Sequence, residues 1–249
     1  MAAFFSRIKD TFALAKDSVG FLLVSIIVIA AIIVIAVIAE RLIYRGKAKK
    51  RADARYVAVC GIMSAMAAVL MLFEVALPFA PSFYKIDFSE IPVLIGAFSL
   101  GPVAGVIIEL VKILLKVFFL KGTTTAFVGD FANFLIGCTF VVPASVIYHV
   151  HKTKKFALIG MGVGALIMTV FGSAFNAIYL IPKFAQLYGM PLDAIVAMGT
   201  AVNPKITSVT TLALFAVVPF NILKGALVTV ITLLLYKHIS PLLKGVGHK

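Results

Sequence analysis

The sequence contains no tryptophan, only two cysteines and only ten acidic residues among its 249 positions. Without tryptophan, any aromatic ring that covers a ligand or anchors a helix at a membrane surface must belong to Phe or Tyr. Cys60 and Cys138 both lie inside apolar runs, and neither has the spacing to a second Cys or to His that a disulfide framework or a zinc site requires. We therefore expect no disulfide and no metal site, and we expect both cysteines to be small packing residues.

Charged residues are also scarce, at 13% of the chain, whereas hydrophobic residues make up 62% and the mean hydropathy is +1.12. A soluble domain of this size does not carry so much apolar surface. The apolar runs are continuous over about 18 to 25 residues, which is the length of a membrane-spanning helix, and they do not alternate in polarity as barrel strands do. The composition predicts an all-α integral membrane protein.

The net charge of +13 comes from basic clusters that lie between apolar runs, within residues 41–55, 151–155 and 237–249. Basic clusters beside membrane spans stay on the cytoplasmic side, so this distribution favours a membrane topology over a nucleic-acid-binding surface. All three clusters fall on one side when the apolar runs are threaded alternately through a bilayer. We predict a multi-pass membrane protein with its amino terminus outside and its carboxyl terminus in the cytoplasm.

The apolar runs divide the chain into segments. The first has apolar residues at helical spacing and is expected to lie on a membrane surface, and the run after it is an anchor because a stop-transfer cluster follows at once. Six further runs form a six-helix core, expected near 56–77, 91–100, 103–120, 131–150, 156–181 and 212–236, with a long outer loop at 182–211. The predicted organisation is a surface segment at 1–19, an extra transmembrane anchor at 20–40, a basic cytoplasmic linker at 41–55, a six-helix substrate-binding membrane domain at 56–243 and a cytoplasmic tail at 244–249.

Residues 84–112 place several charges among apolar residues. Lys85, Asp87 and Glu90 fall within one short loop, and Glu109 and Lys112 lie inside an apolar run. A charge near the middle of a bilayer costs about 3 kcal/mol on insertion scales, so such residues are paired, lie at a helix end or face a polar cavity. The spacing of Glu109 and Lys112 puts them on one helix face, where we expect a structural ion pair.

Amide side chains recur at a similar predicted depth in three spans. Asn221 and Lys224 share one helix face just after a proline, which frees a backbone carbonyl and can bend the helix. Asn176, with Tyr179 three residues later, lies toward the outer end of the preceding span, and Asn133 lies at the start of another. Amides and an ammonium suit a ligand with carbonyl and imide groups. The alternative is that the amides join helices by hydrogen bonds and that the lysine snorkels toward the surface.

Small residues recur along the first core span. Ala58, Gly61 and Ala65 repeat at a spacing of three and four residues, and Ser64 and Ala68 extend the pattern. Such a stripe lets another helix approach closely. We interpret the face as a docking surface for a partner protein rather than for the rest of the bundle.

Several motifs together resemble one transporter family. They are PFAP at 78–81, KIDFSEIP at 85–92, GA at 96–97, GPVAG at 101–105 and PFNILKG at 219–225. Over residues 56–243 the sequence is similar to the riboflavin-binding S component of energy-coupling factor (ECF) transporters. The resemblance implies a subunit of the bacterial cell membrane that has no catalytic cofactor, carries riboflavin or FMN as its transported ligand, and works with a transmembrane coupling protein and two cytoplasmic ATPases. The chain has no Walker motif, so ATP would be hydrolysed on those partners.

The resemblance also implies roles for single residues. Asn176, Asn221 and Lys224 match positions that bind the isoalloxazine ring. The residues that match the lid over the ring and the ribityl chain are Tyr84, Lys85, Ile86, Asp87 and Phe88. Asn133 and Tyr179 complete the predicted binding set. The docking face for the coupling protein is matched by Ala58, Gly61 and Ala65. Gly61 departs from a strict alanine pattern, and the extra anchor departs from the six-helix plan.

Two other functions stay open at this point. Glu109 and Lys112 within a span also suit a self-sufficient secondary carrier driven by an ion gradient, although the sequence shows no internal repeat. Asp87 and Glu90 could act as the paired carboxylates of a membrane enzyme, but no nucleophile or metal-ligating His stands near them in the sequence. Riboflavin and FMN are not separated either, because Lys85 can meet a phosphate or a hydroxyl.

Overall fold

The computed structural model describes residues 19–44, 53–81 and 83–244. The surface segment predicted for residues 1–19 lies outside the described residues except for its last position. The middle of the predicted basic linker and all but the first residue of the predicted tail also lie outside them.

Seven helical stretches in the described ranges match the seven predicted spans. They are α2 (Val19–Ile43), α3 (Ala54–Leu70), α4 (Glu90–Leu100), α5 (Pro102–Leu115) with the π-helical turn η1 (Lys116–Leu120), α6 (Val128–His151), α7 (Lys154–Phe175) with η2 (Asn176–Leu180) and α8 (Ile181–Leu187), and α10 (Val209–Leu212) with η3 (Ala213–Val217) and α11 (Val218–Lys244). A separate short helix, α9 (Leu192–Thr200), follows α8, and the strands β1 (Val75–Ala76) and β2 (Lys85–Ile86) pair as an antiparallel hairpin.

Length and composition agree with the predicted fold class. Four stretches are long and apolar enough to cross a membrane, at Val19–Ile43, Val128–His151, Lys154–Leu187 and Val209–Leu235. Two further apolar helices, α3 and α4, are shorter. The prediction of an all-α membrane protein with an extra amino-terminal helix is confirmed.

Two boundaries differ from the prediction. The first core helix ends at Leu70 instead of residue 77. Beyond its end, Glu74 pairs with Lys85 and Lys121, and Pro78 disfavours helical backbone at the residue before it. The outer loop expected at 182–211 is largely helical: α8 continues α7 through η2, and α9 packs beside it around Ile181 and Ile195. This end of the molecule is therefore a packed cap.

Local sequence signals set several helix ends. The Thr153 side chain accepts a backbone N–H in the first turn of α7, and Ser208 forms a capping box with Thr211 at the start of α10. Between α4 and α5 the chain reverses at Gly101, whose φ of +115° is readily adopted only by glycine. Pro102 then occupies the first turn of α5, where its missing N–H is not needed.

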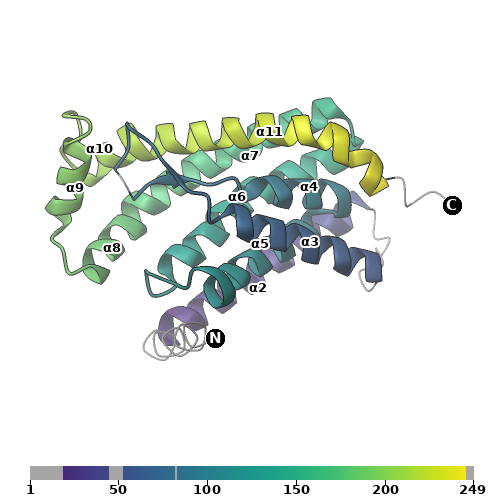
Figure 1. The fold of residues 1–249 in the computed structure, drawn as a ribbon, viewed down its shortest axis with the longest axis horizontal. Helices are drawn as coiled ribbons and strands as arrows, with labels where there is room; N and C mark the ends of the chain where they lie inside the picture. The colour runs from purple at the N-terminus through teal and green to yellow at the C-terminus, as the bar shows by residue number, and fades with distance from the viewer. Residues whose placement is uncertain (1–18, 45–52, 82, 245–249) are drawn as a thin grey trace.

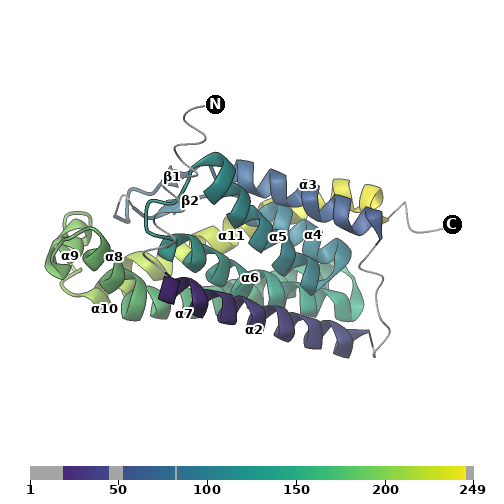
Figure 2. The ribbon, with the colours of Figure 1, turned by 90° about the horizontal axis from the view of Figure 1, so that it is seen from below.

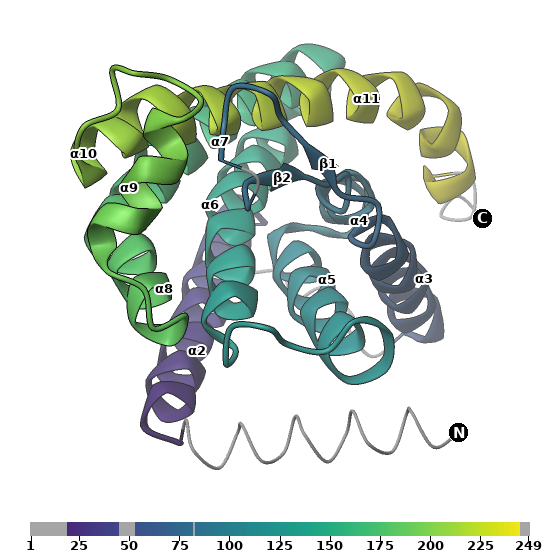
Figure 3. The same cartoon turned by 60° about the vertical axis from the view of Figure 1, so that its left-hand side comes forward.

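The long helices run side by side between two ends of the molecule (Figure 1). One end carries α8, α9 and α10 together with the hairpin, which lies among α4, α6 and α11 when this end is turned toward the viewer (Figure 3). The opposite end carries the turn between α6 and α7, the start of α3 and the end of α11 (Figure 1). The described basic residues of that turn, Lys152, Lys154 and Lys155, thus lie at the same end as Arg41 and Arg55.

The core joins α3, α4, α5, α6, α7 and α11 through buried apolar side chains such as Leu94, Phe140 and Met161. Glycines let α7 approach α6 closely, since a Cβ at Gly160 or Gly164 would meet the backbone of α6. Small residues at a helix interface are the usual way in which membrane helices gain close packing.

The extra helix α2 packs on this core along α5 and α6 (Figure 2). Ala36 is fully buried there beside Val103 and Val106. Glu40 Oε2 accepts a hydrogen bond of 3.3 Å from the Val103 N–H, one of the amide groups at the start of α5 that have no partner inside the helix. The predicted anchor is therefore a seventh helix of the packed bundle.

Candidate functional site

A cavity of about 590 Å³ lies toward the end of the bundle that carries the hairpin, α8 and α9. Its walls come from the β2 loop, the connection between α5 and α6, and the helices α6, α8, α9 and α11 together with all three π-helical turns. Small-molecule sites in proteins have volumes of about 300 to 1,000 Å³. The cavity is large enough for a cofactor-sized ligand and lies away from the basic end of the molecule.

The three π-helical turns surround the cavity. Lys116 enters the wall from η1, Asn176 from η2 and Val217 from η3. The turns η2 and η3 end shortly before Pro182 and Pro219, and a proline lacks the N–H that would close the preceding α-helical turn. The wider turns therefore follow from the sequence, and such turns are frequent at functional sites.

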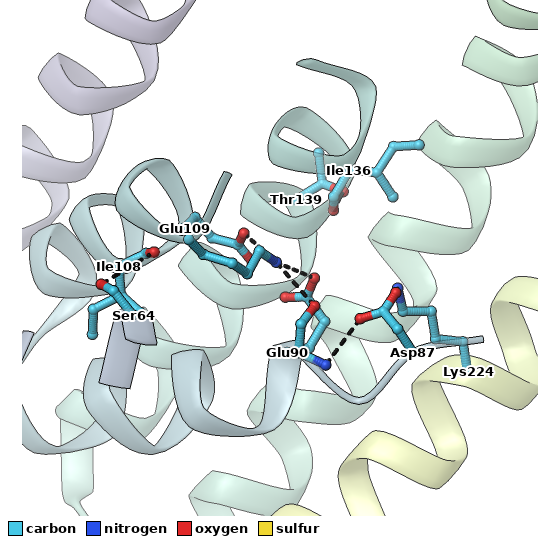
Figure 4. Close-up of polar contacts among 10 residues, drawn as sticks. Ser64, Asp87, Glu90, Ile108, Glu109, Ile136, Thr139 and Lys224 are labelled. Carbon is cyan, nitrogen blue, oxygen red and sulfur yellow. Dashed lines mark hydrogen bonds and ion pairs between the residues drawn. The ribbon is translucent and has the colours of Figure 1, made fainter. Parts of the chain in front are cut away.

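An ion pair joins the loop after β2 to α11 at the wall of the cavity (Figure 4). Asp87 Oδ2 lies 3.1 Å from Lys224 Nζ, and the Ser89 N–H donates to Asp87 Oδ1 over 2.9 Å. Burial acts to raise the pKa of Asp87, but the positive charges of Lys224 and Lys112 and the hydrogen bonds from Ser89 outweigh it and lower the pKa to about 2. Asp87 is therefore ionised at neutral pH.

Beside this pair lies a second, fully buried ionic cluster. Lys112 Nζ is 2.6 Å from Glu109 Oε2 and 3.0 Å from Glu90 Oε1, and the Lys112 and Glu109 side chains are completely buried. The structure thus contains the predicted pair of Glu109 and Lys112. It adds Glu90, which the sequence placed in a loop and which begins α4 instead.

The amides that were predicted at one depth converge on the cavity. Asn176 and Asn221 both line it and are almost fully buried. The Tyr84 hydroxyl donates to Asn176 Oδ1 over 3.0 Å, and Asn176 Nδ2 donates to the Gly172 carbonyl over 2.8 Å. Asn133 also lines the cavity, and its buried Oδ1 has no hydrogen-bond partner within the described part of the chain. That oxygen can accept a hydrogen bond from a ligand.

One acid lies between two bases in the cavity wall. Glu74 Oε2 lies 3.2 Å from Lys85 Nζ, and Glu74 Oε1 lies 2.8 Å from Lys121 Nζ. These contacts join the hairpin loop to the connection between α5 and α6. Aromatic rings form part of the wall, with the ring centroids of Tyr84 and Phe220 5.5 Å apart. The predicted lid residues Tyr84 and Lys85 therefore lie at the cavity.

Three predicted binding residues do not line the cavity. Ile86 of β2 is buried, and Phe88 packs against the main core. Alternate residues of an extended segment point to opposite sides, which explains why Asp87 faces the cavity and both of its neighbours do not. Tyr179 stacks on Phe175 at 5.3 Å between ring centroids, because the wide turn η2 carries it to another face than Asn176. The structure gives these three side chains packing contacts.

Sequence reasoning missed two charged features of the cavity wall. Lys116 forms an ion pair of 2.5 Å with Asp130, which begins α6 fourteen residues later. Glu90 also reaches the wall. The single signal for Asp130 was its place beside an apolar run, and nothing in the local spacing pointed to Lys116.

The predicted docking stripe divides between two faces of α3. Ala58, Gly61 and Ala65 are exposed, and a Cβ at Gly61 would meet no other atom within 4 Å. Ser64 and Ala68 are buried inside the bundle instead. The three exposed residues form an open surface of small side chains outside the cavity.

The profile of one protein family, the substrate-specific component of ECF transporters, matches residues 55–236. The chain belongs to this family of S components. A similar relative is riboflavin transporter RibU of Staphylococcus aureus (strain TCH60), which is 34% identical over 183 residues, covering 74% of this chain and 89% of that protein. Riboflavin transporter FmnP of Bacillus subtilis (strain 168) is 29% identical over 184 residues, covering 74% of this chain and 90% of that protein.

A solved structure of the S component of a bacterial ECF transporter is also similar. It shares 33% sequence identity with this S component at a TM-score of 0.57, covering 76% of this chain and 96% of that chain. The family profile begins at residue 55, so α2 lies outside the matched range. The fold and family inferred from the motifs are confirmed.

Proposed function

We propose that this S component binds riboflavin, or a closely related flavin such as FMN, in the cavity and delivers it across the membrane. One observation carries the proposal: Asn176, Asn221 and Lys224, predicted to hold the flavin ring, come from two different helices and converge on one cavity. The relatives named as riboflavin transporters support the choice of ligand.

The chemistry of the wall fits a flavin. One edge of the isoalloxazine ring presents two carbonyls and an N–H, which amide side chains and an ammonium can satisfy. Lys224 Nζ has three donors, and its contact with Asp87 uses one of them. The faces of the ring are apolar and suit contact with Tyr84 and Phe220. The open Oδ1 of Asn133 provides a further acceptor for a ligand hydroxyl or N–H.

Any ATP that drives delivery would be hydrolysed on partner chains, because the sequence has no Walker motif. We place a transmembrane coupling protein on the exposed face of Ala58, Gly61 and Ala65, where close helix approach is sterically possible. Two cytoplasmic ATPases complete the proposed assembly. The basic end then faces the cytoplasm and the cavity opens outside, with the amino terminus outside and the carboxyl terminus inside.

The residues that suggested an ion-driven carrier or a membrane enzyme are held in ion pairs in this structure. Glu109 and Lys112, the basis for an ion-driven carrier, are paired with each other inside the bundle. Asp87 and Glu90, the basis for an enzyme, are each held by a lysine and do not form a free carboxylate pair. The family is a transporter component and not an enzyme.

Titration of flavin fluorescence tests the proposal. The purified full chain should quench riboflavin fluorescence saturably, with one flavin bound per chain, and FMN should be titrated beside it to compare a phosphate with a hydroxyl. Because the chain has no tryptophan, quenching of intrinsic tryptophan fluorescence cannot serve as the signal, and the flavin fluorescence itself is followed. The absence of saturable binding of both flavins to folded protein would overturn the proposal.

A further inference from the structure

The ionic groups around the cavity floor do not balance in charge. Asp87 and Lys224 form a neutral pair. Glu90 and Glu109, however, share the single ammonium of Lys112. In their ionised forms these three groups carry one excess negative charge.

An uncompensated charge at this position is costly. Lys112 and Glu109 are completely buried, and the Glu90 side chain is 2% exposed. Removing an ionised carboxylate from water is strongly unfavourable unless it is paired and hydrogen-bonded. Figure 4 shows Glu109, Glu90, Asp87 and Lys224 as a row of side chains inside the bundle. With Lys112, which pairs with both glutamates, the row holds two cations and three anions, and it therefore requires one further positive charge.

Two oxygen atoms show where that charge can lie. Glu90 Oε2 and Glu109 Oε1 are buried, and neither has a hydrogen-bond partner within the described residues. Both carboxyl groups lie in the space left by Gly137 of α6. If this residue carried a Cβ, that atom would lie 2.5 Å from Glu109 Oε1 and 3.1 Å from Glu90 Oε1. Both groups thus lie close together against a glycine whose lack of a side chain makes room for them.

We propose that Glu90 and Glu109 share one bound proton, so that this carboxyl pair is a proton-binding site beside the cavity floor. Two carboxylates held in one buried site cannot both ionise at low cost, and one of them keeps a proton. Two ionised carboxylates can only accept hydrogen bonds, and the proton gives one of them an O–H that donates to the other. The proton also brings the net charge of the row to zero. Glu90 lines the cavity, so the site also keeps that part of the wall neutral toward an uncharged ligand.

The charged and titratable groups that act on the pair come from α5, from the loop before α4, from α6 and from α11. Lys112 lies on α5, Asp87 precedes α4, Lys224 reaches across from α11 and the Cys138 thiol faces the carboxyl groups from α6. Both lysines already have carboxylate partners. Among these groups the shared proton remains the charge that completes the row.

Infrared spectroscopy of the full chain, without flavin, tests this site. A protonated carboxylic acid has a C=O stretching band that an ionised carboxylate lacks, and the band shifts in heavy water. We expect such a band at neutral pH, its loss in Glu109→Gln or in Glu90→Gln, and its retention in the control Asp193→Asn, which changes an exposed carboxyl of α9 outside the row. The two Gln variants give independent readings, since each replaces one half of the pair by a neutral side chain of similar size.

Thermal unfolding as a function of pH gives a second readout. The folded chain keeps a proton that the unfolded chain releases above the ordinary Glu pKa of about 4.3. Wild-type stability should therefore fall as the pH rises from that value until the pair is deprotonated, and this fall should be absent in Glu109→Gln. Wild-type protein without the band, or with a band that persists in both Gln variants, would overturn the proposal. If the wild-type protein lacks the band and its thermal stability is higher in sodium chloride than in choline chloride, the site holds a metal cation in place of the proton.

Discussion

Asp87 and Lys224 are 137 residues apart in the sequence, and their side chains form an ion pair of 3.1 Å between Oδ2 and Nζ. The pair fastens the loop after β2 to α11 at the wall of the cavity. The ion pair thereby joins two of the segments that line the cavity. The fold and the binding site depend on each other at this point.

Loss of a ring-edge contact should weaken flavin binding. We expect Asn221→Ala and Lys224→Ala to reduce affinity by about 1.5 to 3 kcal/mol each, since a buried or charge-assisted hydrogen bond is lost. This corresponds to about ten- to hundredfold in Kd. The matched control is Ile222→Ala, which changes an exposed side chain of the same helix. Flavin titration of the three variants measures the effect, and unchanged affinity in both site variants would remove the site assignment.

The pKa of Asp87 gives a pH dependence of known sign. Burial is outweighed by the positive charge of Lys224, so the pKa is about 2 in the folded protein, below the value of about 3.9 for an unperturbed Asp. A carboxyl with a lowered folded pKa contributes stability that is present above the unfolded pKa and is lost as pH falls through the folded pKa. The free energy of unfolding of wild type, followed by thermal unfolding, should therefore exceed that of Asp87→Asn by a constant amount above about pH 5. This difference should shrink below about pH 4. A margin that changes with pH between about 5 and 8 would contradict this assignment.

The exposed small residues of α3 should matter for transport and not for binding. We expect Gly61→Leu to abolish flavin uptake by cells while leaving flavin affinity unchanged, because the bulky side chain blocks close approach of a partner helix. The matched control is Gly162→Leu on α7, since a Cβ at either glycine meets no other atom within 4 Å. Copurification of the coupling protein is the third readout. Normal uptake by Gly61→Leu, or an equal loss with Gly162→Leu, would remove the docking face.

The contact between α2 and the start of α5 should contribute to stability. Glu40→Ala removes an acceptor for the Val103 N–H and should cost about 0.5 to 2 kcal/mol, the usual effect of losing a helix cap. Glu40→Gln keeps an acceptor oxygen and should lose less. Thermal unfolding of the two variants in detergent checks this order. Equal stability of Glu40→Ala and wild type would show that α2 is held by apolar packing alone.

Much of the architecture could be predicted because hydrophobic run length and basic clusters constrain each span locally. The common depth of Asn176 and Asn221 followed from topology, since antiparallel neighbours bring equal depths together. The pairing of Glu109 with Lys112 followed from helical periodicity alone. These features depend on residues that are close in the sequence or on the order of the spans.

Other features depended on tertiary contacts that no local pattern carries. The sequence did not show that Glu90 joins Lys112, or that Glu40 reaches Val103 across the basic linker. Tyr179 was assigned to the cavity from α-helical spacing, and the π-helical turn η2 moved it away. The anchor at residues 20–40 was recognised as a span, but its packing on α5 and α6 became visible only in the fold.

The most direct test of the central claim is an experimental structure of the chain with riboflavin bound. We predict that the ring lies in the cavity with its polar edge against Asn176, Asn221 and Lys224, and with Tyr84 at one face. A ring bound elsewhere, for example in the apolar groove between α2 and Phe131, would contradict the account.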